Sequence, residues 1–139
     1  MAAINGPNAI VLSGDLHSLN EVSQQLTNDS IRFKFLKVSH AFHSPLMEPA
    51  KLELEKAINE TNFRQPICPV YQNVNAKPFV NSDEIKKNLI AQLTAPVRWT
   101  QTIQQMIADG ATLFTEVGPG KVLAGLIGKI DKEAVTANA

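Results

Sequence analysis

The chain has 139 residues, enough for one domain, and its 44% apolar and 19% charged content lie in the usual globular range. The 13 basic and 13 acidic side chains balance, which argues against nucleic-acid binding, because nucleic-acid-binding proteins normally carry a basic excess or patch. The single cysteine excludes an internal disulfide framework and a cysteine-based metal site. No signal-peptide pattern and no apolar run of membrane-spanning length is visible, so we expect an intracellular, cytoplasmic protein.

The first third of the chain alternates between strand and helix patterns. Short apolar runs at 2–5 and 9–13 predict two strands joined by an Asn-Gly-Pro-Asn turn. Apolar residues at helical spacing predict a helix over 16–27, and alternating apolar residues predict a third strand over 33–38. This order is typical of part of a small α+β sandwich.

The remainder resembles the edge of a parallel α/β sheet, with too few strands to complete one. A Ser-Pro pair suits the start of its first helix, and a Gly-Pro-Gly turn precedes its last helix. The expected elements are a helix over 45–61, a strand over 70–74, helices over 82–93 and 99–107, a strand over 113–117, a helix over 122–130 and a frayed tail over 132–139. The fold class that we expect is therefore α/β.

The densest group of reactive side chains is the run VSHAFHSPLM at 38–47, between a predicted strand and a predicted helix. Histidine is the natural general base near neutral pH and would activate a serine or cysteine held elsewhere. His40 or His43 could equally cap the helix or fill a gap, and spacing alone leaves both interpretations open. The two histidines have neither zincin nor zinc-finger spacing, so we expect no metal site.

Five segments carry motifs that are recognisable together. They are NGPNAIVLSG at 5–14, VSHAFHSPLM at 38–47, YQNVNAKP at 71–78, QLTAPVRW at 92–99 and EVGPGKVL at 116–123. In this order they resemble motifs of the malonyl-CoA:acyl carrier protein transacylases and of the related acyltransferase domains of polyketide synthases. The resemblance covers nearly the whole chain.

The resemblance implies a role for each residue of the histidine motif. His43 would take the proton from a nucleophilic serine, and the backbone carbonyl of Gln92 would hold its imidazole in the working tautomer. His40, Ala41 and Phe42 would bind substrate, with Phe42 filling the space that an α-methyl branch needs and so favouring malonyl over methylmalonyl. The implied reaction moves malonyl from coenzyme A to acyl carrier protein through a serine ester, in fatty-acid or polyketide synthesis, with no metal or organic cofactor.

The nucleophile that the resemblance calls for is not visible. None of the seven serines lies in the G-x-S-x-G turn on which the family places it. We therefore expect 1–42 to be part of a ferredoxin-like small subdomain, 43–131 to be the C-terminal part of an α/β-hydrolase-like large subdomain, and 132–139 to be a tail. Alone, the chain is expected to be inactive.

Two further functions remain to be weighed. The chain could be a non-catalytic module that docks acyl carrier protein or completes a partner chain, for instance a separate N-terminal half. A small ferredoxin-like regulatory domain is disfavoured, because such a domain would not need the motifs after residue 70. Exposed strand edges would favour homo-oligomers or poor solubility; neither nucleic acid nor membrane is an expected partner.

The other candidate residues suggest structural roles. The turn at 118–120 could cradle a phosphate, but a packing turn is the stronger interpretation, with Glu116 satisfying backbone groups nearby. Cys68 is expected to be a buried thiol. His17 is expected on an exposed helix face.

Overall fold

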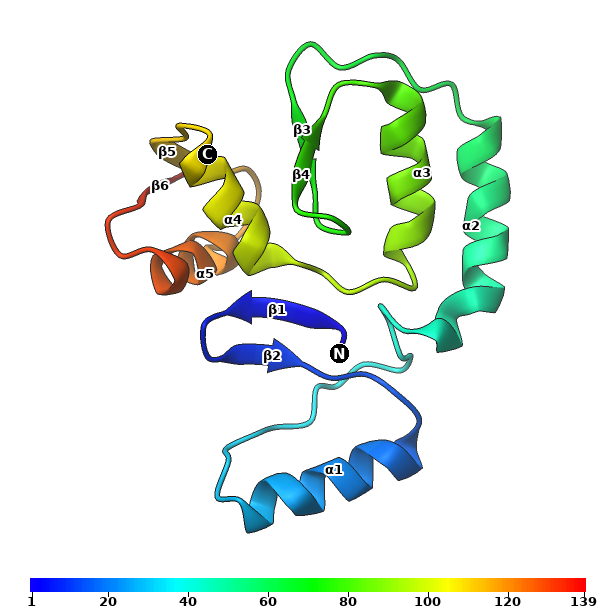
Figure 1. The fold of residues 1–139 in the computed structure, drawn as a ribbon, viewed down its shortest axis with the longest axis vertical. Helices are drawn as coiled ribbons and strands as arrows, with labels where there is room; N and C mark the ends of the chain where they lie inside the picture. The colour runs from blue at the N-terminus through cyan, green and yellow to red at the C-terminus, as the bar shows by residue number, and fades with distance from the viewer.

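Six short strands pair two by two in the computed structural model, which describes residues 1–139 (Figure 1). The pairs β1–β2 and β3–β4 are antiparallel, whereas β5–β6 is parallel. The elements are β1 (Ala3–Gly6), β2 (Ala9–Val11), α1 (Leu16–Asn28), the 3₁₀ turn η1 (Pro45–Met47), α2 (Glu48–Glu60), β3 (Val70–Gln72), β4 (Lys77–Phe79), α3 (Ser82–Gln92), α4 (Trp99–Ala108), β5 (Leu113–Glu116), α5 (Val122–Ile130) and β6 (Val135–Asn138). The α/β class expected from the sequence is confirmed.

Strand β1 joins the start of the chain to its second half. The amide of Ile4 donates to the carbonyl of Val97 at 2.9 Å, and the amide of Val97 donates to the carbonyl of Ala2 at 2.8 Å. Thr100 Oγ1 adds a third bond, to the carbonyl of Ile4 at 3.0 Å. Strand β1 also contacts α4 and α5, so the N-terminal strand lies against the C-terminal helices (Figure 1).

The buried core is small. Only 13 of the 139 residues are buried, and Ile103 on α4 is the most enclosed, at 1% exposure. The other buried apolar side chains come from several elements: Ala2, Ala3, Met47, Ile58, Ala76, Ile85 and Ile127. Helices α2 and α3 pack on each other, while α1 lies apart beyond β2 (Figure 1).

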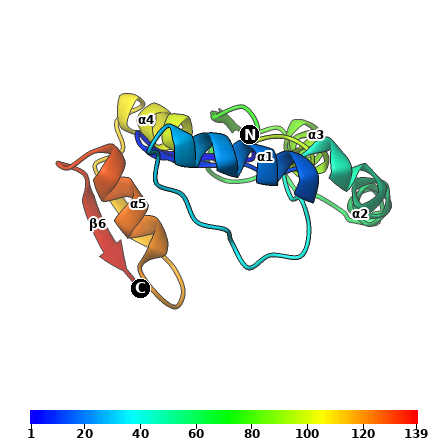
Figure 2. The same cartoon turned by 90° about the horizontal axis from the view of Figure 1, so that it is seen from below.

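The strand expected over 33–38 is not present. Its only backbone hydrogen bond joins the amide of Val38 to the carbonyl of Leu36, and the side chains of Phe33 and Phe35 are exposed. An alternating pattern shows which face a strand would bury, but the strand also needs a neighbour for its ladder, and none of the three strand pairs reaches this segment. Seen from below, the connection between α1 and η1 loops away from the other elements (Figure 2).

The expectation of a frayed tail is also wrong. Residues of β6 pair in parallel with β5, from Leu113 opposite Val135 to Glu116 opposite Asn138. The segment Val135–Asn138 does alternate apolar and polar residues, but it is short and every residue of it is exposed, so the pattern alone was too weak to predict a strand that forms by pairing with β5. Strand β4 was not among the expected strands. It contains Pro78, and proline is tolerated at the edge of a sheet.

None of the helices has both the length and the apolar character needed to cross a membrane.

Because Ile103 is almost fully enclosed, removing one of its methyl groups should leave a small void. We expect Ile103→Val to lower the free energy of unfolding by about 0.5–1.5 kcal/mol. Ile67, whose side chain is fully exposed, is the matched control, and Ile67→Val should change stability by less than about 0.5 kcal/mol. Urea unfolding midpoints measure both. Equal shifts in the two variants would contradict the packing described for α4.

Candidate active site

A tight turn at residues 41–44 carries the histidine motif into η1. Ser44 begins this turn of helix: its hydroxyl donates to the carbonyl of Ala41 at 2.7 Å and accepts the amide of Leu46 at 3.3 Å. The Ser44 side chain is buried, so these bonds are sheltered from water. The helix cap expected at Ser44 is thus confirmed.

His43 has an unusual backbone conformation. Its φ is 60°, in the left-handed region that few residues other than glycine adopt, although histidine does so more often than most. The His43 amide donates to the carbonyl of Leu93 at 3.1 Å. This conformation brings a part-buried imidazole to the end of α3, with Nδ1 only 2.9 Å from the carbonyl oxygen of Gln92.

The carbonyl of Gln92 lies at the end of α3, where the last carbonyls have no partner within the helix. In a continuing helix it would accept the amide hydrogen of residue 96, but that residue is Pro96, which has none. Helix α3 ends with this acceptor free for His43. The Gln92 side chain turns elsewhere: its Nε2 donates to the carbonyls of Ala95 at 3.1 Å and Pro96 at 3.4 Å.

The contact fixes the tautomer of His43. A carbonyl oxygen can only accept, so Nδ1 must carry the hydrogen and Nε2 of the neutral ring keeps its lone pair. No side chain or backbone group of the chain hydrogen-bonds Nε2. The arrangement can therefore serve as a general base at Nε2, held from behind by a carbonyl. The contact implied by the resemblance is present; the catalytic roles of His43 and Gln92 stay predictions.

The three residues predicted to bind substrate precede His43 directly. His40 and Phe42 are exposed, and their rings meet edge to face with centroids 6.0 Å apart. Ser39 Oγ lies 2.8 Å from His40 Nδ1 and orients that ring. Ala41, between His40 and Phe42 in the sequence, is half-buried. These side chains are thus placed together beside the imidazole, and their role in binding stays a prediction.

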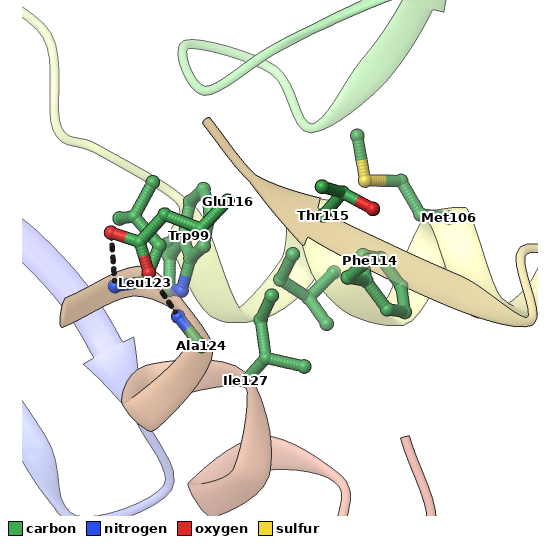
Figure 3. Close-up of a pocket in the computed structure, with 9 residues that line it drawn as sticks. Trp99, Met106, Phe114, Thr115, Glu116, Leu123, Ala124 and Ile127 are labelled. Atoms are coloured by element: carbon green, nitrogen blue, oxygen red, sulfur yellow. Dashed lines mark hydrogen bonds between the residues drawn. The ribbon is translucent and has the colours of Figure 1, made fainter. Parts of the chain in front are cut away.

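Glu116 occupies the helix end that might have cradled a phosphate. Its carboxylate accepts the amides of Leu123 at 3.2 Å and Ala124 at 2.9 Å, at the start of α5 (Figure 3). An anion there would have to displace it. Asn138 Nδ2 donates to the carbonyl of Gly120 at 2.6 Å and ties the turn to β6. The structural role expected for Glu116 is confirmed.

An apolar hollow of about 180 Å³ lies between α4, β5 and α5 (Figure 3). The sequence did not single it out, since apolar residues at helical spacing indicate only a buried face. Residues 41–44 are not among the residues that line it. The lining residues are Trp99, Ile103, Met106, Phe114, Thr115, Glu116, Leu123, Ala124 and Ile127.

The expected exposure of His17 is confirmed, whereas the expected burial of Cys68 is not. His17 lies on the exposed face of α1, 3.5 Å from Glu21, as expected. Cys68 is exposed, so the expectation of a buried thiol is wrong. It follows Ile67 in the connection before β3, where residues 67–69 are all exposed although two of them are apolar.

Comparison with known proteins decides the family. The model of the acyl transferase domain matches residues 1–136. The chain belongs to the acyl transferase domain family. The malonyl CoA-acyl carrier protein transacylase of Bacillus subtilis is 38% identical to this acyl transferase chain over 138 residues, which is 98% of the chain and 43% of that protein.

Solved structures that resemble the chain agree with this family assignment. The malonyl-CoA:acyl carrier protein transacylase of Xanthomonas oryzae matches with a TM-score of 0.94 and 37% identity, over 99% of this chain and 44% of that one. A malonyl-transacylase solved in complex with its type II polyketide acyl-carrier protein matches with a TM-score of 0.92 and 29% identity, over 99% and 45%. The acyl transferase chain thus spans less than half the length of these relatives.

The geometry makes a prediction for the neutral imidazole of His43. We expect the Nδ1–H tautomer to dominate, because the Gln92 carbonyl selects it. Long-range ¹⁵N–¹H correlation spectra in alkaline solution distinguish the two tautomers. The exposed His17 ring serves as the internal comparison: its Nδ1 faces Glu21 only at 3.5 Å on a solvent-exposed helix face, so it should favour the Nδ1–H form less than His43 does. A dominant Nε2–H form of His43 would contradict the contact.

Proposed function

We propose that this chain supplies the general base of an acyl transferase that moves malonyl from coenzyme A to acyl carrier protein. One observation carries the proposal: His43 is held through Nδ1 by the Gln92 carbonyl while Nε2 is unengaged. The names of the relatives supply the substrates, since they are malonyl CoA-acyl carrier protein transacylases. Residues 1–42 would belong to the small ferredoxin-like subdomain, and 43–131 to the large one.

In the proposed reaction, Nε2 of His43 takes the proton of a serine hydroxyl as the serine oxygen attacks the malonyl thioester carbonyl. The C–S bond breaks, and the leaving coenzyme A sulfur receives the proton from the imidazolium. The thiol of the carrier protein then reverses these steps on the serine ester. Gln92 contributes only its backbone carbonyl, which stabilises the imidazolium and holds its orientation.

The serine is proposed to come from the rest of the acyl transferase fold, in the same or another polypeptide. The serines nearest to His43 have other bonds: Ser44 binds the carbonyl of Ala41, Ser13 that of Phe42, and Ser39 the ring of His40. None of their hydroxyls hydrogen-bonds Nε2 of His43. By itself, the chain would be a base without a nucleophile.

The chain exposes more surface than a compact protein of its mass, which supports a partner that covers part of it. It exposes 9733 Å², whereas a compact protein of 15.2 kDa exposes about 7,100 Å². The difference, about 2,600 Å², is larger than the roughly 800 Å² that one partner buries in a standard interface. Many large apolar side chains are exposed, including Phe33, Phe35 and Val117. The rest of the acyl transferase fold, which would carry the serine, would cover this surface. Without it, we expect the chain to self-associate.

Phe42 is proposed to determine which acyl group the site accepts. Its ring is backed by His40 and lies one residue before the base. A methyl branch on the substrate would compete with this ring for space, which typically changes discrimination by about 1–3 kcal/mol. Malonyl would therefore be preferred over methylmalonyl without absolute exclusion.

A chimera tests the proposal: the 138-residue matching part of the Bacillus subtilis relative is replaced by this chain. We expect malonyl transfer to a carrier protein, with a loss of turnover of about 10²–10⁴-fold in His43→Ala because the base is removed. Gln92→Ala should cost far less, since the carbonyl remains. Initial rates with malonyl-CoA measure both.

His17→Ala is the matched control, because that histidine is exposed on α1 and should leave turnover unchanged. Equal losses in His43→Ala and Gln92→Ala would contradict the backbone role of Gln92. A folded chimera that binds carrier protein without transferring malonyl would favour the non-catalytic docking module instead.

A further inference from the structure

A single hydrogen bond links the start of the chain to the histidine turn. Ser13 Oγ donates to the backbone carbonyl of Phe42 at 2.8 Å, across 29 positions of sequence. No other hydrogen bond joins residues 1–30 to residues 38–47. Ser13 follows β2 and lies two residues before Asp15, which caps α1, so it is held between two elements of defined geometry.

The carbonyl that Ser13 binds belongs to the peptide unit that precedes His43. The same unit contains the His43 amide, which donates to the carbonyl of Leu93 at 3.1 Å. Both polar atoms of this peptide plane are therefore fixed, one by the β2–α1 junction and the other by the end of α3. The peptide is planar, so holding its two ends sets the plane's rotation about the N–Cα bond, which is φ of His43.

The φ rotation of His43 is the one that the surrounding hydrogen bonds have to hold in place. His43 has a φ of 60°, a left-handed value that a residue with a Cβ adopts only where its surroundings enforce it. The bond from Ser44 Oγ to the Ala41 carbonyl fixes the preceding peptide from the other side. Were the plane to rotate toward an ordinary φ, the imidazole would move away from the Gln92 carbonyl.

We propose that Ser13 is a positioning residue for His43, acting through the Phe42–His43 peptide plane. Its hydroxyl keeps that plane in the orientation from which the imidazole reaches Gln92, and it couples the β2–α1 junction to the base. The same bond fixes the backbone of Phe42, so the selectivity residue and the base share one support. The catalytic consequence rests on the proposed function, whereas the effect on His43 itself does not.

The first test uses this chain alone and reads His43 directly. In Ser13→Ala, we expect exchange of the His43 amide hydrogen to accelerate about five- to tenfold, the factor that corresponds to one hydrogen bond of ordinary net strength. The imidazole should shift from the Nδ1–H tautomer toward a mixture. Ser13→Thr keeps a hydroxyl and should restore both readouts.

Ser23→Ala is the matched control. Ser23 Oγ also donates to a backbone carbonyl, that of Asn20 at 2.8 Å, but this bond lies within α1 and does not approach His43. Unchanged exchange and tautomer in Ser13→Ala would overturn the proposal. Equal changes in Ser13→Ala and Ser23→Ala would overturn it as well, because they would indicate a general loosening.

The second test uses the active chimera. Ser13→Ala should lower kcat several-fold with little change in KM for malonyl-CoA, and Ser13→Thr should recover the loss. It should also reduce the preference for malonyl over methylmalonyl, because the Phe42 backbone is released. An unchanged kcat and an unchanged preference would overturn the catalytic part. If the chimera itself is inactive, the proposed function fails, while the spectra of the isolated chain still decide the role of Ser13.

Discussion

The site depends on the hydrogen bond between the imidazole of His43 and the backbone carbonyl of Gln92. A backbone acceptor in this role has two consequences. It selects the tautomer without adding a second titrating group beside the imidazole, and it requires a helix-end carbonyl that no backbone amide occupies. Helix α3 ends at Gln92, and Pro96, which has no amide hydrogen, could not occupy this carbonyl even if the helix continued. The contact between His43 and Gln92 is thus built from the way α3 ends.

A strained residue at this position is costly, and its supports come from separate elements. His43 takes a left-handed φ, and the turn around it is held by Ser44 from η1, by Ser13 from the β2–α1 junction and by Leu93 at the end of α3. Strain of this kind persists where the surroundings over-determine it, and it is concentrated at functional sites. The turn also runs into buried side chains, Ser44 and Met47, so packing and hydrogen bonds hold it together.

Residue patterns predicted only local parts of this arrangement, and the contact between His43 and Gln92, 49 positions apart, was implied by the family resemblance alone. The motif at 38–47 and its resemblance to a known family indicated His43 and Gln92, and Ser-Pro indicated the helix start. The bond from Ser13 to Phe42 could not be read from the sequence, because it joins residues brought together only by the fold. The same limit explains the absent strand at 33–38 and the unexpected β6, since strand formation depends on a neighbour as much as on a pattern.

The central claim is that this chain carries a base and no nucleophile. The most direct test is the intact mass of the folded chain after incubation with malonyl-CoA, measured before and after treatment with hydroxylamine, which cleaves acyl esters. The account predicts an unchanged mass, because no serine of the chain hydrogen-bonds Nε2 of His43. A malonyl adduct that hydroxylamine removes would contradict it and would identify a nucleophile within these 139 residues.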